Sequence, residues 1–143
     1  MDKTTITTLL KSKDEIRDSF NKVVTILCNH LANKYPESTF GLYRQTIHNY
    51  ITDLPYEPIA QFIAHVYSKD DYRQKILASD ESFFINQTYD DYSNHETHIF
   101  MIKDIWNNMD DNNKKFVKMT FKSLVERTQL YVDVLCDINK LKK

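Results

Sequence analysis

The C-terminal part of the sequence constrains the fold more than any other stretch. A polar turn at residues 110–115 is followed by apolar residues that recur every three or four positions. This spacing places one apolar stripe along a long α-helix. The stripe favours burial over contact with water, so the preceding residues must supply a surface that covers it. The stripe consists of Phe116, Val117, Thr120, Phe121, Leu124, Val125, Tyr131, Val132, Leu135 and Ile138.

The glycine content also limits the fold. The chain has 143 residues but only one glycine, Gly41, and three prolines. Strand-rich folds use many glycines in turns and bulges, and phosphate-binding loops and Gly-x-Ser-x-Gly nucleophile motifs need several close together. The composition therefore predicts helices joined by short polar turns and excludes both of those catalytic motifs.

Shorter apolar series precede the C-terminal one, and prolines separate them. Pro36 and Pro55 end the first two series, because the residue before a proline avoids helical geometry. We therefore expect an all-α fold, a single compact bundle of about six helices with a long C-terminal helix, formed by residues 1–143 as one domain. Residues 1–11 are rich in threonine, and we expect them to form a loosely ordered lead-in.

Charge and cysteine use indicate an intracellular protein outside the membrane. The 19 basic and 20 acidic residues give a net charge of −1, which provides no overall attraction to nucleic acid or anionic lipid. We find no secretory signal and no run of the roughly 20 apolar residues that a membrane helix needs. Cys28 and Cys136 both fall on apolar stripes, so we expect buried, reduced thiols. A disulfide requires the first and last helices to touch at these two positions.

One short motif carries metal-binding side chains. His95, Glu96 and His98 place two imidazoles three residues apart, which can share a helix face and suit Zn²⁺. The zinc-protease pattern needs histidines four apart, and no third or fourth ligand is evident nearby. A metal-dependent enzyme is therefore the weaker alternative, and we expect no catalytic residues, metal or cofactor.

An aromatic cluster near the longest non-periodic stretch predicts a protein-binding site. Exposed aromatic side chains often anchor protein interfaces. Alternatively, Phe83 and Phe84 fold back into the bundle and Trp106 caps the core, which is the favoured interpretation for Trp106. The predicted partner-binding residues are Phe83, Phe84, Tyr89, Tyr92 and Trp106.

A second alternative is nucleic-acid binding by the basic C-terminal part. Its residues would be Arg127, Lys140, Lys142 and Lys143, which could contact phosphates. Four positive charges on a nearly neutral protein more often belong to a solvated helix surface, so we place this alternative second.

Three segments resemble a family of small helical proteins encoded by nucleocytoplasmic large DNA viruses. Residues 27–37 resemble its leucine-rich opening before an aromatic-Pro-Glu element. Residues 75–84 are similar to its central Ile-Leu…Phe element, and residues 105–115 to the tryptophan-containing turn before its last helix. The chain departs from the family at Phe116 and Val117, where members often have a second tryptophan.

The resemblance implies a viral, intracellular protein with an all-α fold and brings no assigned activity or site residues. Together with the missing catalytic motifs, it predicts a non-enzymatic interaction or structural protein, associated with the virion or located in the host cytoplasm or nucleus. Such a protein would act on a protein partner or by self-association.

Overall fold

A computed structural model describes residues 3–87 and 99–142. Within these residues every regular element is a helix and no strand occurs, which confirms the predicted all-α class. In chain order the elements are α1 (Lys3–Lys34), α2 (Thr39–Leu42), α3 (Arg44–Asp53), α4 (Glu57–Phe62), the π-helical turn η1 (Ile63–Tyr67), α5 (Asp70–Leu77), α6 (Ser82–Ile85), α7 (Lys103–Trp106) and α8 (Asp111–Lys142).

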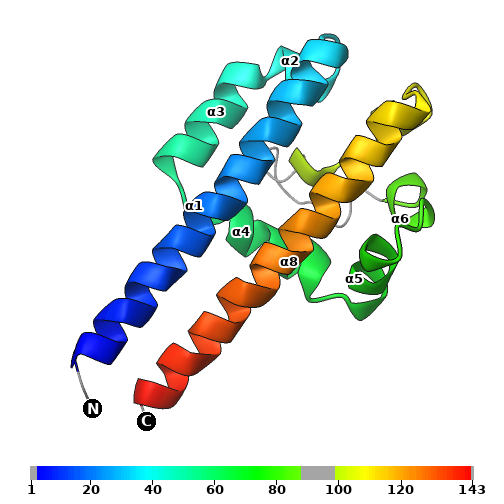
Figure 1. The fold of residues 1–143 in the computed structure, drawn as a ribbon. Coiled ribbons are helices and arrows are strands. Elements are labelled where there is room, and N and C mark those ends of the chain that lie inside the picture. Colours follow the sequence, from blue (N-terminus) through cyan, green and yellow to red (C-terminus); the bar gives the residue numbers. More distant parts are fainter. Residues whose placement is uncertain (1–2, 88–98, 143) are drawn as a thin grey trace.

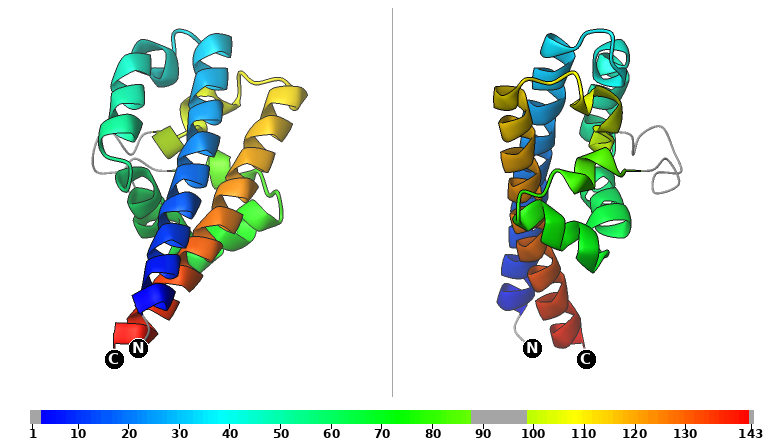
Figure 2. Two further views of the ribbon diagram at one scale, coloured as in Figure 1. Left: turned by 60° about the vertical axis from the view of Figure 1, so that its left-hand side comes forward. Right: turned by 90° about the vertical axis from the view of Figure 1, so that its right-hand side faces the viewer.

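Helices α1 and α8 form an antiparallel pair along the whole length of the molecule (Figure 1). Each has 32 residues, which corresponds to about 48 Å of helix. Arg127 Nε donates to Ser19 Oγ at 2.9 Å, and His30 Nε2 lies 2.7 Å from Asn113 Oδ1 nearer one end. The other described helices all pack on one side of this pair (Figure 2). The bundle and its long C-terminal helix are therefore as predicted.

Helix α1 begins earlier than the sequence suggested. It starts at Lys3, so the prediction of a loosely ordered lead-in is wrong for residues 3–11. Leu9 lies two turns before Ile16 on the same side of α1, and both side chains are half-buried. The apolar stripe therefore extends into the threonine-rich segment, where packing against α8 outweighs weak helix propensity.

The middle of the chain is divided more finely than the predicted helices. The predicted second helix splits into α2 and α3, and Ser38 Oγ caps α2 by accepting from the Gly41 backbone N–H at 3.4 Å. Helix α3 ends at Asp53, before Pro55, as predicted. The predicted third helix continues from α4 into η1, where the Ser68 N–H donates to the Ile63 carbonyl oxygen at 2.9 Å.

Aromatic side chains from distant parts of the chain form the centre of the core. The rings of Phe20 and Phe62 lie 5.5 Å apart, and those of Phe62 and Phe100 lie 5.1 Å apart, both in edge-to-face geometry. Phe121 of α8 joins the group 6.5 Å from Phe100. All four side chains are fully buried, so this cluster joins α1, α4, α8 and the segment before α7.

Candidate protein-interaction surface

Three of the five aromatic residues predicted to bind a partner are buried. Phe83, Phe84 and Trp106 are 2%, 2% and 1% exposed. The rings of Phe84 and Trp106 stack at 4.6 Å, and Phe84 meets Phe121 edge-to-face at 5.0 Å. The assignment of these three residues to an exposed interface is therefore wrong, because they fold back into the bundle, the alternative stated above. Tyr89 and Tyr92 lie outside the described residues.

Among the described basic residues of the nucleic-acid alternative, Arg127 does not share a patch with Lys140 and Lys142. Arg127 is half-buried between α1 and α8, where it donates to Ser19 Oγ and to both the hydroxyl and the backbone carbonyl of Ser123. Lys140 and Lys142 are exposed in the last turn of α8, and Lys143 lies outside the described residues. Thirteen residues separate Arg127 from Lys140, about 20 Å along the helix. Arg127 thus serves the contact between the two long helices.

The predicted metal motif of His95, Glu96 and His98 lies outside the described residues. Residues 3–87 and 99–142 contain no group of three or more His, Cys, Asp or Glu side chains arranged to hold a metal ion. In this part of the chain, His30 packs against Phe116 with ring centroids 4.3 Å apart, and His65 lies 3.1 Å from Gln61 Oε1. His30 of α1 therefore contacts the adjacent α8, and His65 of η1 contacts the preceding turn of helix in α4.

The two cysteines differ in environment. Cys28 is buried and Cys136 is exposed, and both are free, so the prediction of buried thiols holds for Cys28 and is wrong for Cys136. Burial raises the pKa of the Cys28 thiol to about 12, so it stays protonated near neutral pH and is a poor nucleophile. The contact between His30 and Phe116 places Cys28 level with residue 118. Cys136 lies about 27 Å further along α8, too far for a disulfide.

No described helix covers one side of the two long helices (Figure 2). Exposed apolar side chains occur on this side as well as on shorter helices, where Leu42 is 70% exposed. Ile26 of α1 is 50% exposed, and Met119 and Leu130 of α8 are 63% and 55% exposed. Met119 and Leu130 are eleven residues apart, which is three helical turns, so they lie on one line along α8. We call this side the outer face; its exposed residues include Lys11, Lys22, Ile26, Met119, Glu126, Leu130, Asp133 and Asp137.

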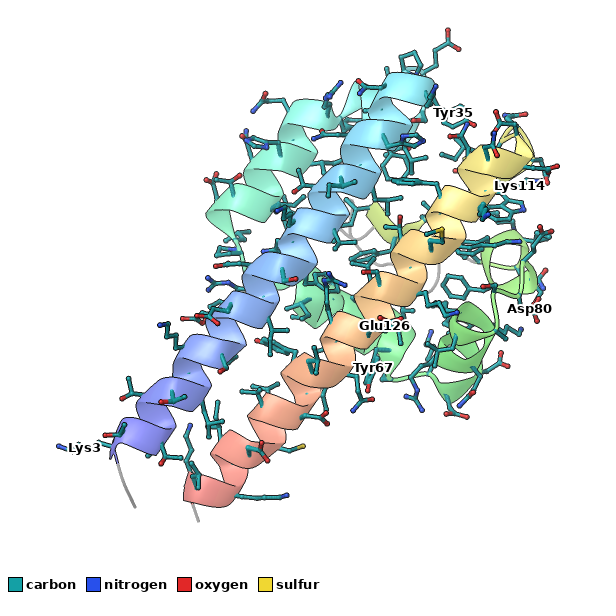
Figure 3. The ribbon with its side chains drawn as sticks, in the orientation of Figure 1. Lys3, Tyr35, Tyr67, Asp80, Lys114 and Glu126 are labelled. Carbon is teal, nitrogen blue, oxygen red and sulfur yellow. The ribbon has the colours of Figure 1, made fainter. Side chains whose placement is uncertain are left out.

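An open groove of about 380 Å³ adjoins the outer face between α5 and α8. The Arg73 guanidinium at its edge pairs with the Asp70 carboxylate at 2.5 Å and lies 5.1 Å from the centroid of the Tyr67 ring. Glu126 lies on the rim, on α8 (Figure 3), and forms no ion pair within the described residues. The groove is lined by Arg73, Leu77, Val125, Glu126, Gln129 and Leu130.

The outer face is acidic along the C-terminal half of α8, while on α1 the Lys11 ammonium lies 4.0 Å from the Glu15 carboxylate. On α8, Glu126, Asp133 and Asp137 follow one another at seven and four residues and so share one side with Leu130. On α1, Lys22 forms no ion pair within the described residues, and the nearby Asp18 carboxylate is held by Arg17 at 2.7 Å. The outer face therefore combines apolar side chains with an acidic row on α8 and an unpaired positive charge on α1.

Comparison with known proteins provides no relative from which the role of the outer face could be inferred. No protein-family model, curated protein or solved structure matches this chain. Among the described helices, none has both the length and the apolar character that a membrane crossing needs.

The sequence did carry a signal for the outer face. Met119 and Leu130 are apolar residues that fall outside the buried stripe of α8, on the side occupied by Glu126. An apolar residue on an otherwise charged helix side indicates a contact surface when it recurs at whole turns.

Proposed function

We propose that this chain is a non-enzymatic interaction or structural protein that acts through a protein–protein interface on its outer face. The observation that carries the proposal is the exposure of Ile26, Met119 and Leu130 on one side of the two longest helices. Large apolar side chains surrounded by charged residues are typical of protein-binding surfaces.

The partner that suits this surface is a helical protein surface with complementary charges. Its positive side chains would face Glu126, Asp133 and Asp137 on α8, and a carboxylate would face Lys22 on α1. Apolar side chains of the partner would cover Met119 and Leu130. Charges at the rim of such an interface contribute orientation and association rate more than affinity.

The origin and location of the protein are part of the same proposal. The resemblance of residues 27–37, 75–84 and 105–115 to proteins of large DNA viruses supports a viral protein that works inside the host cell or is packaged in the virion. A stable helical bundle with one charged, partly apolar face suits a component that joins other proteins.

A photoreactive amino acid placed at Met119 tests the interface in cells that produce the protein. We expect a covalent adduct with one defined protein, identified by mass spectrometry, and no such adduct when the same residue replaces Thr46, which is exposed on α3. The purified partner should then bind the wild type and lose affinity for Leu130→Glu. Equal adducts at both positions, or none at Met119, would contradict the proposal.

A further inference from the structure

The register between α1 and α8 determines which residues of the outer face lie at the same height. Arg127 contacts Ser19, and His30 packs against Phe116. These contacts place Lys22 at the height of residue 124 on α8. Glu126 is two residues further on, so Lys22 and Glu126 differ in height by about 3 Å along the helix axis. They also place Ile26 level with residue 120, next to Met119.

Two symmetric arrangements can bring the outer faces of two copies together. A two-fold axis perpendicular to the helices, in the plane of contact, places α8 on α8 of the second copy. When this axis passes through the middle of α8, near residue 126, the Glu126 carboxylates of the two copies meet, which is unfavourable because like charges repel. A two-fold axis parallel to the helices instead places α1 of one copy on α8 of the other.

The parallel axis pairs Lys22 with Glu126. Each copy keeps its own height along the axis, so Lys22 of one copy meets Glu126 of the other, and the reverse pair forms by symmetry. Lys11, which already pairs with Glu15 at 4.0 Å, then faces the segment that carries Asp133 and Asp137, so the Lys22–Glu126 pairs are the ones that favour this axis. Lys22 and Glu126 are both exposed and form no ion pair in the described part of the single chain.

The apolar residues and the size of the face fit the same arrangement. Ile26 of each copy is brought against Met119 of the other, so two half-exposed apolar pairs become covered. Two helices of 32 residues, each about 48 Å long and 10 Å wide, offer on the order of 900 Å² per copy. A stable interface of ordinary size needs about 800 Å² per partner.

We propose that the outer face binds the same face of a second copy of this chain, about a two-fold axis parallel to α1 and α8. This inference rests on the proposed function and names its partner. The interface is charged and has a small apolar centre, so its affinity falls as salt is added.

Reversing the charge of Lys22 or Glu126 tests the arrangement, because reversing the charge of an exposed residue outside the interface would not change the dissociation constant. In low salt, sedimentation equilibrium of the wild type should show a monomer–dimer equilibrium. Lys22→Glu and Glu126→Lys should each raise the dissociation constant by about tenfold or more, because each homodimer then contains two like-charge pairs. Lys103→Glu and Glu37→Lys are the matched controls, because both residues are exposed outside the outer face, and they should leave the dissociation constant unchanged.

Mixing the two variants is the decisive measurement. In the heterodimer of Lys22→Glu with Glu126→Lys, the two substituted side chains form one ion pair with reversed polarity. The other site keeps the native pair of Lys22 with Glu126, so association should return to the wild-type level. Circular dichroism verifies that both variants are folded.

Two results would overturn the proposal of self-association. One is a wild type that stays monomeric at every concentration in low salt, and the other is a mixture no tighter than the separate variants. If a different protein is then captured at Met119, the proposed function stands while self-association does not.

Discussion

The side-chain amide of Gln87 donates a hydrogen bond of 2.8 Å to the backbone carbonyl oxygen of Phe100. The Oε1 atom of the same amide accepts from the backbone N–H groups of Ile102 and Lys103, at 2.8 and 3.1 Å. Gln87 is 2% exposed, so one buried side chain joins the end of α6 to the segment that leads into α7. Sequence reasoning did not single out this residue.

Replacing Gln87 with leucine should destabilise the protein by about 2 to 4 kcal/mol, because buried backbone groups of Phe100 and Ile102 lose their hydrogen-bond partners. Urea unfolding followed by circular dichroism measures the change. Asn86→Leu, at the exposed neighbouring position, is the control and should have little effect. A Gln87→Leu variant as stable as the wild type would show that these bonds contribute little.

Gly41→Ala should also destabilise the fold, by about 3 kcal/mol or more, because overpacking against backbone leaves no room to relax. A Cβ atom at Gly41 would lie 2.1 Å from the carbonyl oxygen of Pro36 and 2.5 Å from its carbonyl carbon. Thermal unfolding compares this variant with Thr46→Ala, an exposed alanine control on α3. An unchanged melting temperature for Gly41→Ala would mean that the turn before α2 shifts freely.

The two thiols should react at very different rates with a thiol reagent at neutral pH. Cys136 is exposed, whereas Cys28 is buried and its pKa is raised to about 12. One thiol should therefore react at once in the native protein, and the second only as the protein unfolds. Cys136→Ser should remove the fast phase alone. Rapid modification of Cys28 in the folded Cys136→Ser variant would contradict its buried position.

Tyr56 should ionise at higher pH than a free tyrosine. Its phenol donates a hydrogen bond to the Asp14 carboxylate. This hydrogen bond is the main cause that raises the Tyr56 pKa above its ordinary value of 10, and partial burial is the second cause. Because the folded pKa lies above the unfolded one, the associated stability is fully present below pH 10 and is lost as the pH rises through the folded value. NMR titration of labelled tyrosine, assigned with Tyr56→Phe, measures the pKa, and Asp14→Ala should lower it.

The sequence was sufficient to predict the fold class because periodicity reports burial directly. Each stripe residue predicted between Phe116 and Ile138 is buried or half-buried in α8. The predicted proline boundaries are confirmed, since α1 ends at Lys34, before Pro36, and α3 ends at Asp53, before Pro55. These features are local, so they can be read without knowledge of the tertiary contacts.

The site could not be located in the same way, because exposure depends on contacts between distant segments. Nothing local distinguishes buried Phe84 from an exposed aromatic residue; its burial follows from stacking on Trp106 and packing against Phe121. Arg127 likewise belongs to a basic stretch of the sequence, but its side chain contacts Ser19, more than a hundred residues earlier in the chain. The sequence indicates the α8 part of the outer face, through Met119 and Leu130, but its α1 part follows only from the pairing of α1 with α8.

The pairing of α1 with α8 has a consequence for how the protein is made. On the ribosome α1 emerges before the other described helices and α8 emerges after them, so the apolar stripe of α1 lacks its main partner while the intervening segments are made. Contacts between segments so far apart in sequence slow folding and leave intermediates prone to aggregation. Nascent chains that stall before Phe121 should therefore be the species that chaperones bind and proteases remove.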